Sequence, residues 1–64
     1  MREPIYRVTN DDDPGDYIYP IAVSWRTLAE NGDTAMLDVA PLKVGQSVTI
    51  GGGAAVQFTM TRIR

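Results

Sequence analysis

A two-residue period runs over residues 17–26 of this chain, with a large apolar or aromatic side chain at every second position. The positions of one parity carry Tyr17, Tyr19, Ile21, Val23 and Trp25. Because successive side chains of a strand point to opposite faces of a sheet, this pattern predicts a strand with one buried face. Pro20 cannot donate a hydrogen bond to a neighbouring strand, so we expect an edge position or a bulge there.

Other strand-like segments lie on both sides of this one. Residues Ile5 to Thr9 are rich in β-branched and aromatic types, which favours a first strand. Residues Gln46 to Ile50 and Ala55 to Ile63 also alternate, and three glycines separate them. This arrangement predicts a hairpin whose tip is Gly51, Gly52 and Gly53.

A further hairpin is predicted around Asn31 and Gly32, since Asn-Gly is a strong turn signal between two strand-like runs. An odd-length loop, Glu30 to Gly32, would pair Trp25 with Leu37 and Val23 with Val39. That register keeps the apolar side chains on one face, and a slip by one residue would invert it.

The sequence thus predicts an all-β fold, a small antiparallel barrel or curled meander of about five strands with two hairpins, in a single domain of residues 1–64 centred on Trp25. A chain of 64 residues buries a small core. It contains no cysteine and no histidine, so disulfides are excluded and sites for soft metals are not expected. Self-association or docking onto a larger protein is therefore favoured.

Charge and composition narrow the function classes further. The net charge is −2, which gives no overall attraction for nucleic acid. No apolar run is long enough to span a bilayer, and the segment after Met1 lacks the apolar stretch of a signal peptide. We expect a protein that is cytoplasmic or virion-associated. Without histidine or cysteine, no residue pair has a spacing typical of catalysis, so we expect no enzyme and no cofactor.

Four carboxylates crowd into the turn-forming segment that follows the first strand: Asp11, Asp12, Asp13 and Asp16. The composition of residues 10–16 predicts a surface loop. A calcium loop counted from Asn10 has Gly15 at its sixth position, but Pro14 and Ile21 occupy the fifth and twelfth. The calcium pattern fails, and we expect a solvated turn with no metal; the less favoured alternative is a weak hard-cation site formed by Asp11, Asp13 and Asp16.

The candidate contact residues lie in the predicted loops and at the ends of the predicted strands. Tyr17 and Tyr19 border the acidic loop, and aromatic residues beside carboxylates are typical of protein-recognition surfaces. The glycine tip offers adaptable contact with a partner. These features predict a non-catalytic protein-binding or assembly module, with partner contacts at Asp11, Asp12, Asp13, Asp16, Tyr17, Tyr19, Gly51, Gly52 and Gly53.

The alternative is a β domain that binds RNA or single-stranded nucleic acid. If the first and last strands are neighbours, the terminal arginines converge, and Tyr6 would offer a surface for base stacking. The residues concerned are Arg2, Tyr6, Arg7, Arg62 and Arg64. Terminal arginines also serve simply as solubilising ends and as guards of edge strands.

Residues Val44 to Gly51, preceded by Leu42-Lys43, resemble the opening segment of the carbon storage regulators, small dimeric β proteins that bind messenger RNA. The resemblance covers about eight residues. It implies RNA binding, but the basic, histidine-containing segment by which that family contacts RNA has no counterpart here. In general type, small acidic β proteins without cysteine are also similar to phage virion components and host-directed inhibitors.

Overall fold

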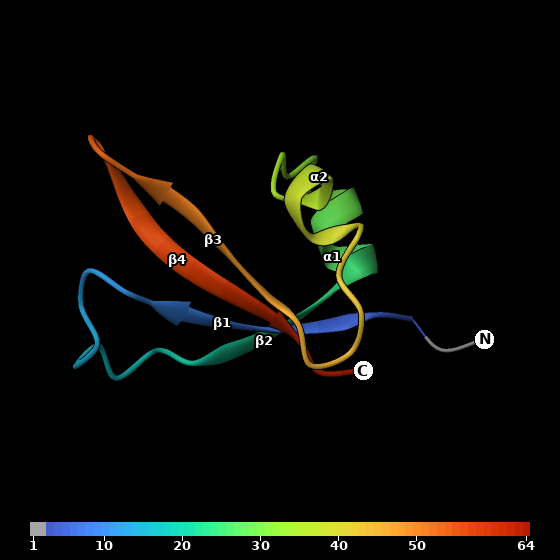
Figure 1. Cartoon of the computed structure of the whole chain (residues 1–64), viewed down its shortest axis with the longest axis horizontal. Coiled ribbons are helices and arrows are strands. Elements are labelled where there is room, and N and C mark those ends of the chain that lie inside the picture. The colour runs from blue at the N-terminus through green and yellow to red at the C-terminus, as the bar shows by residue number, and fades with distance from the viewer. Residues whose placement is uncertain (1–2) are drawn as a thin grey trace.

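The computed structural model describes residues 3–64 and folds them into one open sheet with two short helices (Figure 1). The elements are β1 (Ile5–Asn10), β2 (Ile21–Ser24), α1 (Trp25–Glu30), α2 (Met36–Val39), β3 (Ser47–Gly52) and β4 (Ala55–Arg62). The four strands lie in the order β2-β1-β4-β3, and every neighbouring pair is antiparallel.

The first and last strands pair at the centre of the sheet. Val8 lies opposite Met60, and Thr9 lies opposite Thr59. Beyond the strand end, the Ile63 amide donates to the Ile5 carbonyl at 2.9 Å. Because β2 and β3 each attach to this central pair from outside, the two ends of the chain together hold the sheet.

The sheet has one apolar and one polar face. Tyr6, Val8 and Met60 are buried on the apolar face, and Val48, Ile50 and Phe58 continue it as half-buried positions. On the other face, Thr9, Thr59 and Thr49 form a row across β1, β4 and β3. One solvated face is typical of an antiparallel sheet.

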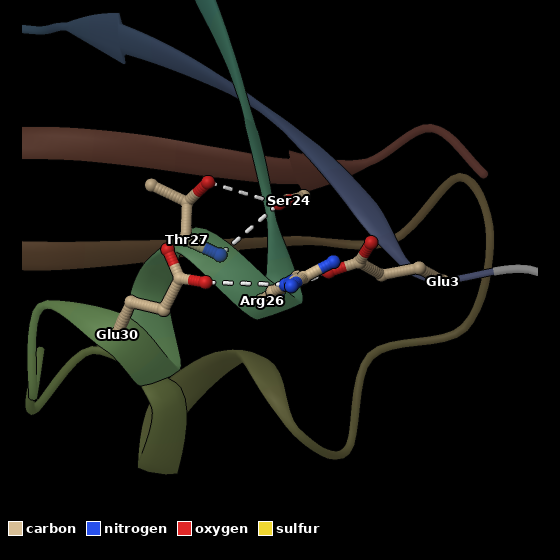
Figure 2. A network of polar contacts seen from close by, with 5 residues as sticks. All are labelled: Glu3, Ser24, Arg26, Thr27 and Glu30. Carbon is tan, nitrogen blue, oxygen red and sulfur yellow. Dashed lines mark hydrogen bonds and ion pairs between the residues drawn. The ribbon is translucent and has the colours of Figure 1, made fainter.

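Helix α1 begins where β2 ends, because Ser24 is its N-cap. The Ser24 side chain accepts a hydrogen bond from the Thr27 amide at 3.1 Å, and the Glu3 carboxylate accepts one from the Arg26 amide (Figure 2). These bonds occupy amide groups that have no partner within the helix. Arg26 and Glu30 form an exposed ion pair at 3.1 Å, to which we assign little stability.

The core lies between the helices and one half of the sheet. Its buried residues are Tyr6, Val8, Leu28, Ala35, Val39 and Met60. Figure 1 shows both helices over the half of the sheet that is nearer the chain ends. The hairpin tip and the loop between β1 and β2 extend beyond them. Neither α1 nor α2, the helices of the described residues, has the length and apolar content to cross a membrane.

The hairpin predicted around Asn31-Gly32 is wrong. Residues 25–30 and 36–39 are helical, so Trp25 does not pair with Leu37, nor Val23 with Val39. Gly32 does have a positive φ of 62°, but it follows the C-cap Asn31 and ends α1. The observed fold is therefore mostly β, with four strands in an open sheet in place of five in a barrel or meander.

The predicted strands hold for β1, β3 and β4, whereas the strand predicted over residues 17–26 is confirmed only for 21–24, since residues 17–20 lie before β2 and Trp25 begins α1. β1 lies where the β-branched run predicted it, and β3 and β4 form the glycine-tipped hairpin. β2 is an edge strand that begins directly after Pro20, as the missing amide of proline requires. Trp25 is half-buried at the margin of the core, whereas Tyr6 and Val39 form its centre.

The Ser24 cap predicts a measurable loss of stability when its hydroxyl is removed. Ser24→Ala is expected to lower the free energy of unfolding in urea by about 1 kcal/mol, because the Thr27 amide loses its hydrogen-bond acceptor. Thr34→Ala, at an exposed loop position, is the control and is expected to change it by less than about 0.5 kcal/mol. Equal effects of the two substitutions would contradict the capping role.

Candidate protein-binding surface

An apolar groove lies on the core face of the sheet, beside the helices. Its volume is about 320 Å³. It is lined by Val8, Tyr19, Ile21, Val23, Leu28, Asp33, Ala35, Ile50, Phe58 and Met60. The lining residues come from all four strands of the sheet, from the loop before β2, from α1 and from the loop between α1 and α2. Asp33 is the one charged residue among these lining groups.

The groove is open because the helices are too short to cover the sheet. α1 has six residues and α2 has four, whereas β4 has eight. The aromatic rings of Tyr19 and Phe58 pack at 5.7 Å between centroids and form one wall. Ile21 is 41% exposed in this wall, so part of its apolar surface is in contact with water.

A second hollow of about 270 Å³ adjoins the groove, and Tyr19 lines both. Its polar lining includes Asn10, Asp11 and Asp13, and Pro14 and Pro20 complete it. Tyr19 therefore borders both an apolar recess and an acidic one.

The predicted acidic loop follows β1 and is ordered by its own side chains. The Asn10 carbonyl oxygen Oδ1 accepts hydrogen bonds from the Asp12 and Asp13 amides at 3.1 and 3.2 Å. Asp16 Oδ1 accepts one from the Ile18 amide at 3.0 Å. Both contacts are turns closed by an Asn or Asp side chain, which explains why these residue types occur here.

Two carboxylates of the loop bind β4 directly. Asp11 Oδ2 accepts a hydrogen bond from the Thr59 hydroxyl at 2.5 Å, and Asp12 Oδ2 accepts one from the Gln57 amide at 2.6 Å. The Asp11 amide in turn donates to the Gln57 carbonyl at 2.9 Å. These contacts fix the acidic loop at the same end of the sheet as the glycine tip.

The structure thus brings together the two segments that the sequence predicted to contact a partner. Tyr17 is 96% exposed beside the loop, while Tyr19 lies at the groove. In the part of the chain that the structure describes, no three carboxylates converge into a set that could hold a metal ion. Asp11 and Asp12 are instead occupied by β4.

The glycine tip is shaped by a bulge in β4, where Val56 and Gln57 lie opposite the single residue Gly51 of β3. The pairing between β3 and β4 shifts register between Ile50 and Gly52, and Gly51 has a φ of 89°. A Cβ atom at Gly51 would lie 2.2 Å from the Val56 carbonyl oxygen, whereas one at Gly53 would meet nothing within 4 Å. Gly51 is therefore required by close backbone packing, and Gly53 by its φ of 61° alone.

Arg7 and Arg62, two arginines of the alternative site, lie on opposite faces of the sheet. Arg7 is exposed on the polar face, whereas Arg62 lies opposite Tyr6 and donates to the Leu42 carbonyl at 3.0 Å and the Arg64 carbonyl at 3.1 Å. Tyr6 is only 2% exposed, so its ring is not available to stack on a base. Burial raises the pKa of Tyr6, and the nearby Arg62 lowers it by less. Arg2 lies outside the described residues.

Sequence reasoning identified the inward face but missed the groove. Phe58 and Ile50 occupy the apolar positions of their strands, but the predicted barrel or curled meander included no open groove. The signal for an open face was the Ser24 cap followed by a helical segment too short to cover a sheet. Comparison with protein-family models, with curated proteins and with solved structures finds no match to this chain.

The bulge geometry predicts different costs for two glycine substitutions in one hairpin. Gly51→Ala is expected to lower the free energy of unfolding by about 3 kcal/mol or more, because the new methyl group and the Val56 carbonyl cannot both keep their positions. Gly53→Ala carries only the cost of a positive φ, about 1 kcal/mol. Chemical denaturation of both variants measures the difference, and equal losses would contradict the assigned bulge contact.

Proposed function

We propose that this protein is a non-catalytic protein-binding or assembly module that takes an apolar, basic-flanked segment of its partner into the open groove. The observation that carries the proposal is the apolar sheet face that α1 and α2 leave uncovered. Large side chains such as Ile21, Phe58 and Ile50 line it without a covering element.

Burial of this face supplies the driving force for binding. Apolar surface removed from water contributes roughly 25 cal/mol per Å². Rigid aromatic side chains with polar tips, such as Tyr19 beside Phe58, lose little entropy when a partner packs on them. The groove has a size suited to one or two large apolar side chains of a protein partner.

Charge around the groove defines the rest of the partner segment. Asp33 lies at the groove, and Asp11 and Asp13 line the hollow on the other side of Tyr19. A lysine or arginine beside the apolar anchor would meet these carboxylates. Such complementarity favours specificity and the association rate more than affinity.

A virion component and a host-directed inhibitor are the two forms of this proposal that the general type of the chain suggests. Both act by binding alone, and both are consistent with a small domain that exposes an apolar face. Binding of RNA is the less favoured class, because Arg7 and Arg62 lie on opposite faces and Tyr6 is buried.

Site-specific photo-cross-linking tests the proposal. A photoreactive amino acid at Ile21, in the groove wall, is expected to form adducts with a partner protein in the cells that produce this chain. The same amino acid at Leu37, which is 83% exposed on α2, is the matched control and is expected to give none. Adducts of equal yield at both positions, or nucleic acid as the linked species, would contradict the proposal.

Binding of the partner identified in this way gives a quantitative check. Ile21→Ser is expected to weaken binding by about tenfold, the equivalent of about 1.4 kcal/mol, because an apolar contact is lost. Leu37→Ser is expected to leave the affinity within about twofold. Isothermal titration of the two variants at matched folded fraction measures both values.

A further inference from the structure

The two edges of the sheet are protected very differently. β2 has four residues, begins directly after Pro20 and passes straight into α1. β3 has six residues, and none of them is a proline, lysine, arginine, aspartate or glutamate. Soluble proteins usually blunt an edge with such residues, because unpaired backbone groups invite another strand. This chain guards one edge and leaves the other open.

The pairing of β4 with β3 determines which amide and carbonyl groups of β3 point away from the sheet. The Arg62 amide donates to the Gln46 carbonyl at 3.0 Å, so this position is hydrogen-bonded toward β3. Because hydrogen-bonded and non-bonded pairs alternate in an antiparallel ladder, Val48 and Ile50 also bond to β4. Ser47 and Thr49 then direct their amide and carbonyl groups away from the sheet.

The opposite side of β4 gives the same assignment. The Asp11 amide donates to the Gln57 carbonyl, and the Ile63 amide donates to the Ile5 carbonyl. Alternation from either contact turns the backbone groups of Thr59 and Thr61 toward β1. Those of Met60, between them, therefore turn toward β3.

We propose that a second copy of this chain pairs with the open edge, with β3 antiparallel to β3 about a two-fold axis at Thr49. Thr49 then exchanges two hydrogen bonds with Thr49 of the second copy. On the apolar face, Val48 lies beside Ile50 of the second copy, as a β-branched cross-strand pair. Four strands from each copy form one sheet of eight, with a continuous apolar face.

Electrostatics favour this antiparallel arrangement. The acidic loop and the glycine tip lie at one end of the sheet, whereas Lys43 and Arg62 lie at the other, where β3 begins and β4 ends. Antiparallel copies keep the two acidic loops at opposite ends of the joint sheet, each toward the end of the other copy that carries Lys43 and Arg62. The strand itself carries no charge that would meet its own copy at the axis.

Self-pairing uses the β3 edge and leaves the groove wall at Tyr19 and Ile21 free. It goes beyond the proposed binding of a partner protein and does not depend on it. A failure to dimerise leaves the cross-linking result at Ile21 unchanged, and a failure of that cross-link leaves dimerisation unchanged.

Disulfide trapping tests the predicted register, since the chain has no cysteine of its own. Thr49→Cys is expected to form a covalent dimer under mild oxidation, because a hydrogen-bonded antiparallel pair places its Cα atoms about 5.5 Å apart. Ala22→Cys is the matched control, since Ala22 is exposed on the guarded edge strand β2. It is expected to stay monomeric. Equal yields for the two variants would overturn the proposal.

Sedimentation of variants without cysteine provides the second test. The unmodified chain is expected to shift from monomer to dimer as its concentration rises. Thr49→Pro is expected to stay monomeric with little change in its unfolding transition, because the lost amide faces solvent in the single chain. Thr49→Val retains the amide and is expected to dimerise.

Thr49→Lys tests dimerisation independently if the proline variant does not fold. Its side chain lies on the polar face, so the monomer is retained, but two lysines meet at the axis and dimerisation is expected to fall at least tenfold. A wild-type chain that stays monomeric over the whole concentration series would overturn the proposal, as would a proline and a lysine variant that dimerise like the wild type.

Discussion

The pairing of β1 with β4 is the contact on which the rest of this structure depends. It joins segments near the two ends of a 64-residue chain, so the residues between them form a closed loop. Closing this loop costs conformational entropy, which the packing of the core must offset. Tyr6, Val8 and Met60 supply that packing from the two central strands. β2 and β3 pair with this central pair, and the acidic loop is hydrogen-bonded to β4.

The same central pair divides the molecule into a closed and an open half. Near the chain ends, Leu28, Ala35 and Val39 cover the apolar face and complete the core. Toward the hairpin tip the strands continue, but the helices do not (Figure 1). Aliphatic and aromatic side chains at Ile21, Ile50 and Phe58 thus keep the alternation of a buried strand without full burial. A chain of this size has too few residues to build a second layer over a sheet of this length.

Local sequence signals were sound, but one of them had two structural solutions. Asn31-Gly32 indicated a left-handed glycine, and Gly32 has one, yet the same conformation ends a helix as readily as it turns a hairpin. Trp25 continues the two-residue period of Ile21 and Val23, so the sequence pattern predicted that the strand continues through Trp25. Besides the local Ser24 cap, a non-local contact supports the helix: the Glu3 carboxylate accepts a hydrogen bond from the Arg26 amide. A period along the chain does not report such a contact.

The hairpin of β3 and β4 and the loop after β1 were predictable because their signals are local and agree with one another. Three glycines between two alternating runs permit few other structures, and the Asn10 and Asp16 turns need only their own neighbours. What these segments do to each other was not predictable, because Asp11 and Asp12 reach Gln57 and Thr59 from a distant part of the chain.

The exposed groove and the unguarded β3 edge have one physical origin. Groove residues that no helix covers keep apolar surface in contact with water. Residues of β3 that no outer strand pairs with keep unpaired backbone hydrogen-bonding groups. Pro20 and the turn into α1 limit the pairing of a further strand with β2. The β3 edge has no such protection, so a further strand could pair there. A short chain that closes its core at one end leaves apolar surface and backbone groups uncovered elsewhere. These differ in chemistry: in the two proposals made above, the groove would take side chains of a partner and the β3 edge would take a strand.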